Sequence, residues 1–288
     1  MEKSFSLLIL LMLVACAQTP TSLPTTPPTA TDAPTATLTS TFIPAPSATP
    51  SPVPSGPCDN PLVPLVVGNH WTYRATTGNG ESIYTLEALE RQDQRTIVVL
   101  MDFNDLTRGQ SVQERVVCLD GAIDNFPLFV MDMLFADQLE KLLNTYHERG
   151  AYAPPYAFFA DKNWITSWES NYLTEDSAVI RNPAFDQSLI ISSSSPIELL
   201  FQMDGTREPL KVPAGDFPTA LKVSHSFELN ATIGNSAGVL TVHTTQWYAP
   251  YVGLLRAQVD SATLEAYGQS FEISLPSIVE LMEYTAGK

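Results

Sequence analysis

The stretch of sequence that decides the fold is WTYRATTGNGESIYTLEAL, residues 71–89. Residues 71–74 and 84–89 contain aromatic and β-branched side chains, and the turn-forming tripeptide Gly78-Asn79-Gly80 lies between them. Such side chains favour strands, and a Gly/Asn break between two strand-like segments is typical of a β-hairpin. The stretch therefore predicts two antiparallel strands, and we expect the rest of the domain to extend this sheet.

Strand-like segments continue beyond this hairpin. Residues 96–103 and 111–119 follow after turn-type breaks, so residues 71–119 predict a four-strand antiparallel meander. The second half of the chain repeats the pattern, with strands predicted at residues 220–229, 239–248, 254–260, 270–275 and 278–284. The predicted fold class is mainly β, or β-rich α+β: a large curved antiparallel sheet or half-barrel with one main helix packed across it.

The segment between the two halves predicts that helix. Apolar residues recur there at steps of three and four, the period of an amphipathic helix. They are Met131, Leu134, Phe135, Leu139, Leu142, Leu143 and Tyr146, so we expect a helix over residues 131–146. After it, the aromatic-rich residues 152–168 predict a long irregular crossing, and the serines at 192–195 are interpreted as a loop before Pro196.

The N-terminus has the layout of an export signal. Lys3 is followed by an unbroken apolar stretch over residues 7–15, and Cys16 comes directly after it. This stretch is too short to span a bilayer as a helix, which takes about 20 residues. Residues 1–15 therefore predict a signal peptide. The alternative is an uncleaved signal that carries a cysteine by chance.

The Leu13-Val14-Ala15-Cys16 tetrad resembles the lipobox of bacterial lipoproteins. The resemblance implies cleavage before Cys16, diacylation of that cysteine, and an anchor in the cell membrane or the outer membrane. We therefore expect an extracytoplasmic protein whose first partner is the membrane, through its N-terminal lipid.

Residues 16–57 predict the lipidated cysteine and a disordered linker. Residues 17–57 hold 11 threonines and 11 prolines among 41 residues, with Asp32 as the single charge. Such a segment has too little apolar area to offset its ordering entropy. Fully extended it would reach about 130 Å, and as a flexible coil it would span about 35 Å on average; either is enough to hold a domain clear of the lipid headgroups. Its composition also permits O-glycosylation. We expect residues 58–288 to form the β-rich extracytoplasmic domain.

Charge and cysteine content narrow the function further. The chain has 31 acidic and 15 basic residues and a formal net charge of −16. It has no basic run, which argues against nucleic-acid binding and against attraction to anionic headgroups by charge alone. With lipid on Cys16, the remaining cysteines are Cys58 and Cys118, and a pair in an oxidising compartment predicts a disulfide.

Three short motifs carry a resemblance to a family. They are residues 64–74, residues 212–217 with 220–223, and residues 247–250 with 252–256. They resemble a broad set of uncharacterised bacterial envelope lipoproteins, which implies a curved antiparallel sheet distantly similar to the Lol-type lipoprotein carriers. Tyr251 stands where such sequences often have a second glycine. Because a bulky residue resists positive φ, Tyr251 argues against a tight left-handed turn there.

No pattern in the sequence predicts catalysis. The histidines His70, His147, His225 and His243 are not spaced as metal ligands, and neither a Gly-x-Ser-x-Gly motif nor a glycine-rich phosphate loop occurs. His225 and His243 can lie on neighbouring strands, either as a cross-strand pair or as separate surface or hydrogen-bonded side chains. We therefore expect no enzyme activity, no metal and no cofactor.

Three functions remain. The first is a lipid-anchored, non-enzymatic binding module whose sheet holds an apolar or lipid ligand, as the carrier-like resemblance implies. The second is an envelope scaffold or adhesion module that presents a surface to a protein or polysaccharide, and the least favoured is a hydrolase without a recognised motif. For the first, we predict an apolar pocket lined by Trp71, Tyr73, Phe158, Trp164, Trp168 and Trp247. The alternative is that these aromatic residues simply form the core.

We predict that Cys16→Ser blocks both processing and lipidation, because the thiol of Cys16 is the group that would carry the lipid. Mass spectrometry of the mature N-terminus checks this. The wild type is expected to start at an acylated Cys16, and the variant to retain residues 1–15. An unmodified cysteine, or a mature wild-type chain that starts elsewhere, would contradict the prediction.

Overall fold

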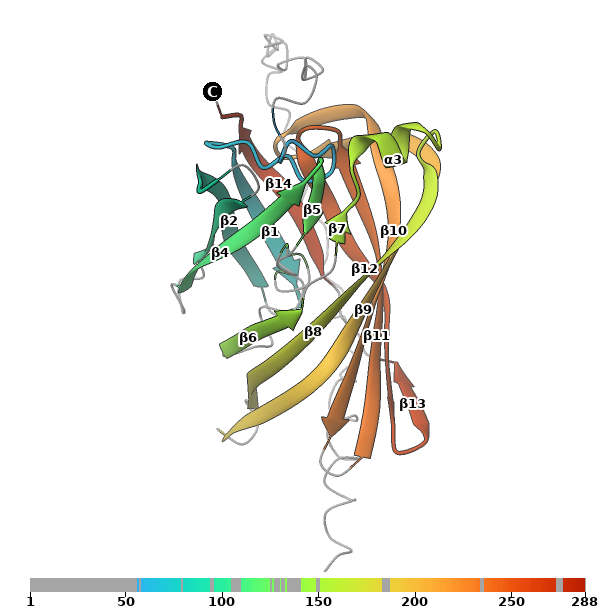
Figure 1. The fold of residues 1–288 in the computed structure, drawn as a ribbon. Helices are drawn as coiled ribbons and strands as arrows, with labels where there is room; N and C mark the ends of the chain where they lie inside the picture. The colour runs from blue at the N-terminus through green and yellow to red at the C-terminus, as the bar shows by residue number, and fades with distance from the viewer. Residues whose placement is uncertain are drawn as a thin grey trace, which may run out of the picture. The chain divides into compact units, whose positions relative to one another are not determined.

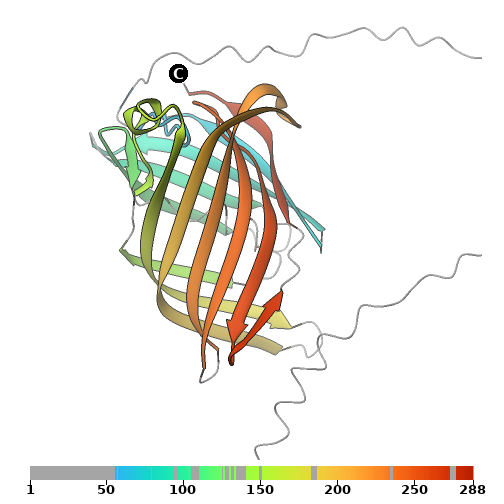
Figure 2. The same cartoon turned by 90° about the vertical axis from the view of Figure 1, so that its right-hand side faces the viewer.

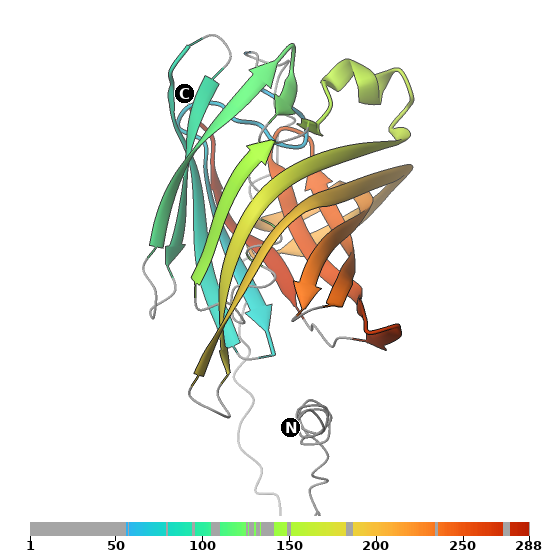
Figure 3. The ribbon, with the colours of Figure 1, turned by 60° about the horizontal axis from the view of Figure 1, so that its bottom comes forward.

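The computed structural model describes Gly56 and residues 58–287, apart from residues 79, 94–95, 105–109, 125, 127–129, 131–132, 134–140, 149–150, 183–186, 234–235 and 273–276. Most of the described residues belong to one antiparallel sheet with the strand order β6-β8-β9-β10-β11-β12-β14-β1-β2-β3-β4-β5-β7, and β13 pairs with β12. The sheet is strongly curved and is not closed, as the sequence predicted (Figure 1 and Figure 3).

The elements follow one another along the chain as β1 (His70–Thr77), β2 (Gly80–Arg91), β3 (Thr96–Asn104), β4 (Gln110–Leu119), β5 (Ala122–Asp124), β6 (Lys141–Glu148), β7 (Ala151–Ala153), α3 (Tyr156–Ala160), β8 (Ile165–Asn182), β9 (Gln187–Val212), β10 (Gly215–Ile233), β11 (Ser236–Ala249), β12 (Gly253–Ala266), β13 (Gln269–Glu272) and β14 (Ile278–Thr285).

The predicted four-strand meander is confirmed. β1 pairs with β2, β2 with β3, and β3 with β4, all in antiparallel fashion. Trp71, Tyr73 and Ala75 are at most 2 % exposed, whereas the residues between them are half-buried. This alternation arises because every second side chain of a strand points to the same face. We call the face that carries these three residues the inner face of the sheet.

The strands predicted in the second half are also present, as β10 to β14. β14 pairs with β1, so Trp71 lies opposite Tyr284 and Tyr73 lies opposite Leu281. The last strand of the chain therefore joins the first, and the sheet runs without interruption from the second half into the meander.

The helix predicted over residues 131–146 is wrong in its C-terminal part. Residues 141–148 form the edge strand β6, which pairs with β8 from Lys141 opposite Val179 onward. Val130 and Met133 are helical and buried, while residues 131–132 and 134–140 lie outside the described residues. Apolar spacing over a few residues does not separate a helix from an irregularly alternating strand. Here the backbone ladder to β8 decides between them.

β8 and β9 form a long hairpin that the sequence analysis missed. Residues 165–168, placed in the irregular crossing, begin β8, and the serines at 192–195, interpreted as a loop, lie in β9 opposite residues 174–177. Serine has a weak strand preference, but its backbone groups pair normally once a neighbouring strand is in place. The rest of the predicted crossing contains β7 and α3. Figure 2 shows the long strands β8 to β12 side by side.

The two ends of the sheet order approach each other through side chains. The indole Nε1 of Trp168 in β8 donates to the carbonyl oxygen of Tyr152 in β7 at 3.1 Å, and the Tyr152 ring packs edge-on against Phe201 of β9 with centroids 5.5 Å apart. The Tyr172 hydroxyl of β8 donates to the carbonyl oxygen of Phe126 at 3.0 Å. Within the described residues, no backbone hydrogen-bond ladder joins β7 to β8. Side-chain packing and side-chain hydrogen bonds therefore keep these two parts of the curved sheet together.

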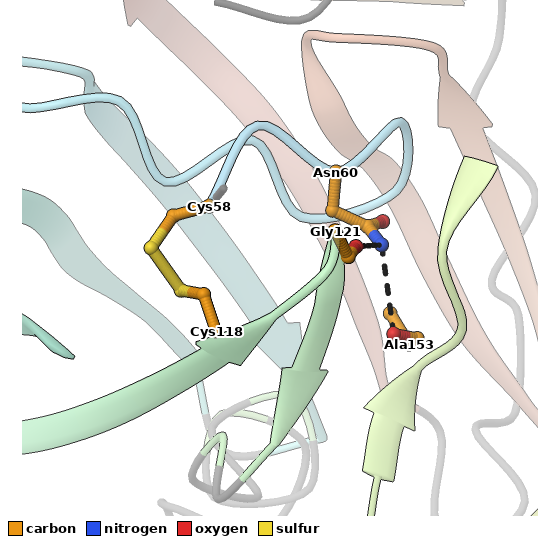
Figure 4. The surroundings of a disulfide bond; sticks show 5 residues. All are labelled: Cys58, Asn60, Cys118, Gly121 and Ala153. Carbon is orange, nitrogen blue, oxygen red and sulfur yellow. Dashed lines mark hydrogen bonds between the residues drawn. A yellow bond between two sulfur atoms is a disulfide. The ribbon is translucent and has the colours of Figure 1, made fainter. Parts of the chain in front are cut away.

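The predicted disulfide is confirmed. Cys58 is bonded to Cys118 of β4, with Cα atoms 5.1 Å apart, and both residues are buried (Figure 4). Cys58 begins a segment without strands, residues 58–69, which we call the cap segment. The disulfide therefore fastens the start of the cap segment to the meander.

We expect the double substitution Cys58→Ser/Cys118→Ser to lower the free energy of unfolding by up to about 4 kcal/mol. The reason is that the bridge spans a sequence separation of 60 and removes that loop's freedom from the unfolded chain. Chemical denaturation of both proteins measures the difference. Dithiothreitol should lower the midpoint of the wild type and leave that of the variant unchanged; a wild-type midpoint insensitive to reduction would rule out a stabilising bridge.

Candidate functional site

Asn60 fixes the cap segment at one end of the curled sheet. Its side chain is fully buried, and its Nδ2 donates to the carbonyl oxygens of Gly121 at 2.8 Å and Pro154 at 2.7 Å. Its Oδ1 accepts the backbone N–H of Leu62 at 2.9 Å. One amide thus ties the cap segment to the β4–β5 turn and to the end of β7. Figure 4 shows its bond to Gly121 and a longer one, at 3.5 Å, to the Ala153 carbonyl oxygen.

Tyr251, between β11 and β12, adopts a left-handed conformation with φ 64°. The expectation that a bulky residue would prevent this turn is therefore wrong. The backbone N–H of Tyr251 donates to the carbonyl oxygen of Pro61 in the cap segment at 2.9 Å, and its own carbonyl accepts the Tyr284 hydroxyl at 3.3 Å. These long-range bonds hold a conformation that the residue alone would resist.

A small cavity lies between the cap segment and the inner face. Its volume is about 20 Å³, which is room for a single water molecule. Burial raises the pKa of Tyr73, Tyr152 and Tyr248, so these hydroxyls stay protonated. The lining residues are Leu62, Val63, Pro64, Trp71, Tyr73, Leu86, Phe126, Val130, Tyr152, Tyr248, Gly253 and Leu254.

A buried chain of polar side chains leads away from this cavity along β11. The Tyr248 hydroxyl donates to Oε1 of Gln246 at 2.6 Å, and Nε2 of Gln246 donates to Oγ1 of Thr244 at 3.2 Å. Thr244 in turn lies 3.1 Å from Nδ1 of His225, and the His225 ring packs on Phe201 with centroids 4.6 Å apart. These groups satisfy one another, as buried polar side chains must.

His225 is neutral in this setting. Desolvation by burial disfavours the imidazolium ion and lowers its pKa to about 3, with a smaller contribution from His243. His243 lies opposite Ser226, on the other face of the sheet, and is exposed. The structure therefore does not form a cross-strand histidine pair; His225 is hydrogen-bonded and His243 is on the surface.

The inner face changes character away from the cap segment. Tyr172 of β8 and Ile197 of β9 lie opposite each other and are buried. The residues that continue this row across β10, β11, β12 and β13 are also apolar and on the inner face, but they are only half-buried. Leu240 lies eight residues along β11 from Tyr248, roughly 26 Å at 3.3 Å per residue. The half-buried residues are Leu229, Leu240, Leu264 and Phe271.

The structure does not gather the six residues of the predicted pocket in one place. Trp71 and Tyr73 line the cavity, and Nε1 of Trp71 donates to the carbonyl oxygen of Val252 at 2.6 Å. Trp164 stacks on Phe159 of α3 and Trp168 packs edge-on against it, each with ring centroids 5.3 Å apart, and Phe158 also packs edge-on against Phe159. These three belong to an aromatic cluster at α3 rather than to the cavity.

Trp247 lies on the outer face. It alternates with Gln246 and Tyr248, and its Nε1 donates to Oε1 of Glu208. Arg256 and Lys222 approach its ring at 5.7 Å and 6.0 Å from the centroid. Its burial comes from these outer-face neighbours, so Trp247 does not belong to an inner pocket.

Sequence reasoning missed the polar chain and the cavity residues supplied by β11. The sequence did contain a signal for them. Residues 244, 246 and 248 alternate along one predicted strand, so they share a face, and the apolar residues of that face are expected to point inside. Tyr152 was also missed as an inner residue, since the segment around it was predicted to be irregular.

Within the described residues, no three His, Cys, Asp or Glu side chains lie close enough to hold a metal ion. The same residues contain no helix that is both long and apolar enough to cross a bilayer.

Comparison with known proteins gives two similar structures. No protein-family model and no curated protein matches the chain. A candidate exported protein with a YmcC-like fold from Bacteroides fragilis NCTC 9343 is 15 % identical, with a TM-score of 0.48 over 79 % of this chain and 98 % of that one. A candidate lipoprotein from Parabacteroides distasonis ATCC 8503 is 16 % identical, with a TM-score of 0.46 over 79 % and 100 %. Neither likeness tests the resemblance to Lol-type carriers, which stays a prediction.

We expect His225 to make the folded state sensitive to acid. Burial lowers its pKa from the ordinary 6.5 to about 3, so below about pH 6.5 the unfolded chain binds a proton that the folded chain does not. Stability present above that pH is lost as the pH falls, on the order of 3 kcal/mol by about pH 4. Denaturation curves across this range measure the loss. His225→Gln should lack this component and His243→Gln should keep it; equal pH dependence in the two variants would refute the assignment.

Proposed function

We propose that the protein is a lipid-anchored, extracytoplasmic and non-enzymatic binding module, whose ligand is a single acyl chain or a similarly narrow apolar molecule. The observation that carries the proposal is the row of half-buried apolar side chains on the inner face: Leu229, Leu240, Leu264 and Phe271. Apolar area left partly open on an inner face favours a ligand that completes its burial. Each methylene buried there would contribute about 0.8 kcal/mol.

Ser170 offers one polar contact beside this row. Its Oγ is buried and has no hydrogen-bond partner within the described residues, which is costly for a hydroxyl. Ser170 lies opposite Leu199, and Leu199 opposite Phe227, so it belongs to the row next to the half-buried one. The carboxyl or ester group of an acyl chain would satisfy Ser170 while the hydrocarbon follows the apolar residues.

The non-enzymatic part of the proposal is supported by the interior chemistry. The buried polar side chains along β11 are hydrogen-bonded to one another, and His225 is neutral and hydrogen-bonded to Thr244. A general base needs an ionisable group free to approach a substrate, and this chain of hydrogen bonds offers none. The anchor and the extracytoplasmic location are supported by the tetrad that ends at Cys16.

We expect Leu240→Asn to weaken the binding of a fluorescent fatty acid about tenfold, since losing half the burial of a leucine costs roughly 1.4 kcal/mol. Ser170→Ala should weaken it about fivefold through the lost hydrogen bond. The measurement is a titration of residues 17–288, exported behind a signal that does not direct lipidation, together with solvent extraction for co-purifying lipid.

Leu200→Asn is the matched control, because Leu200 lies on β9 with its side chain 42 % exposed, outside the inner-face rows. It should bind like the wild type. If no lipid co-purifies and no saturable binding occurs, the ligand proposal fails and the scaffold or adhesion function takes its place.

A further inference from the structure

The exposed large apolar residues gather at the end of the domain that carries the cap segment. Val67 lies within the cap segment, and Leu119 adjoins the β4–β5 turn that Asn60 binds. Asn60 also binds the carbonyl oxygen of Pro154. The chain continues from Pro154 into α3, which contains Tyr156, and then into β8, which begins at Ile165. The described residues with this property are Val67, Leu119, Tyr156, Ile165, Leu200 and Tyr267, so four of the six lie at this end.

The part of this end formed by residues 156–165, which we call the α3 tip, presents aromatic rings with cations among them. The Trp164 ring stacks on Phe159 and meets the edge of Tyr156, with centroids 5.3 and 6.2 Å apart. Nζ of Lys162 lies 3.7 Å from the Phe158 ring centroid, and the Arg207 guanidinium carbon lies 5.4 Å from that of Trp164. Aromatic rings with flanking Lys and Arg side chains are typical of the lipid–water interface.

The backbone holds the α3 tip in a costly shape. Asn163 and Trp164 are both left-handed, with φ 52° and 62°; asparagine tolerates this region, whereas the bulky Trp164 adopts it at a cost. The backbone N–H of Trp164 donates to the Phe159 carbonyl at 2.9 Å, which closes the turn. The turn leads directly into Ile165, whose side chain is 62 % exposed. Backbone strain that leaves an isoleucine exposed to solvent indicates that this surface is functional.

The chain reaches the domain at this same end. The cap segment starts at Cys58, and residues 17–57 connect it to Cys16. A coil of 41 residues averages about 35 Å and an extended chain of that length reaches about 130 Å, so a lipid on Cys16 keeps the cap end within reach of the membrane. Tethering raises the effective concentration of a surface near its target, so the α3 tip needs little affinity of its own.

We infer that the cap end rests on the lipid–water interface of the membrane that holds the anchor, with Tyr156 and Ile165 inserted among the headgroups. The inference rests on the lipid anchor of the proposed function but not on its ligand. By formal charge, Asp161 and Asp204, the latter opposite Ile165, balance Lys162 and Arg207, so we expect apolar and aromatic contacts to drive the insertion. Contact with neutral phosphatidylcholine is therefore sufficient, and the half-buried apolar row faces away from the bilayer.

The test places an environment-sensitive fluorophore on single introduced cysteines in the full-length, lipidated protein. Ile165→Cys and Leu119→Cys report on the cap end, and Tyr267→Cys, in the β12–β13 turn at the other end (Figure 1), is the matched control at 58 % exposure. Cys58 and Cys118 are bonded to each other and will not react. After reconstitution in phosphatidylcholine vesicles, emission at 165 and 119 should shift to shorter wavelength and be quenched by nitroxide-labelled lipid, while emission at 267 stays water-like.

A second variant tests the α3 tip as a unit. Tyr156→Ser/Ile165→Ser should return the label at 119 to a water-like emission, and Tyr267→Ser should leave it shifted. Water-like emission at 165 in a protein whose mass shows the acyl chains overturns the inference while the anchor stands. A shift at 165 that grows with protein concentration without vesicles also overturns it, since a second copy would then cover this end. A chain that lacks acyl groups by mass refutes the anchor instead.

Discussion

The buried amide of Asn60 is the interaction on which the rest of the structure depends. In a curved sheet whose edges are not joined by a backbone ladder, backbone groups at the edges and in the adjoining turns need hydrogen-bond partners from elsewhere. Asn60 satisfies two of them, at Gly121 and Pro154, and so joins the meander to the chain after β7. The disulfide between Cys58 and Cys118 keeps this amide in place from the other side. A shorter or apolar side chain could not make both connections.

Among the described residues, the cap segment covers one end of the sheet interior and no segment of this kind covers the other, so the two ends differ. At the capped end the core is dense, and the small cavity there is bounded by tyrosines that extend into the hydrogen-bonded chain to His225. At the other end apolar side chains such as Leu240 remain half-buried. Both proposals follow this polarity: we propose membrane contact for the capped end and ligand access for the other.

Outer-face contacts also shape the sheet, and they explain why aromatic content was a poor guide to a pocket. Trp247 is buried, with 7 % exposure, yet Glu208 and Arg256 contact it on the outer face. Arg256 forms a salt bridge to Glu280 at 4.0 Å, and Glu280 forms a second one to Arg74 at 3.0 Å. This row of alternating charges crosses β12, β14 and β1, and each member relies on residues from a different strand.

The sequence by itself determined what depends on local pattern. Two-residue alternation placed Trp71 and Tyr73 inside, turn residues separated the strands of the meander, and the composition of the chain left Cys58 and Cys118 to pair. Only the tertiary structure decided that residues 141–148 are a strand, that Trp247 faces outward and that Tyr251 turns left-handed. The physical reason is shared: each depends on partners far away in sequence, whose hydrogen bonds and packing outweigh local preference.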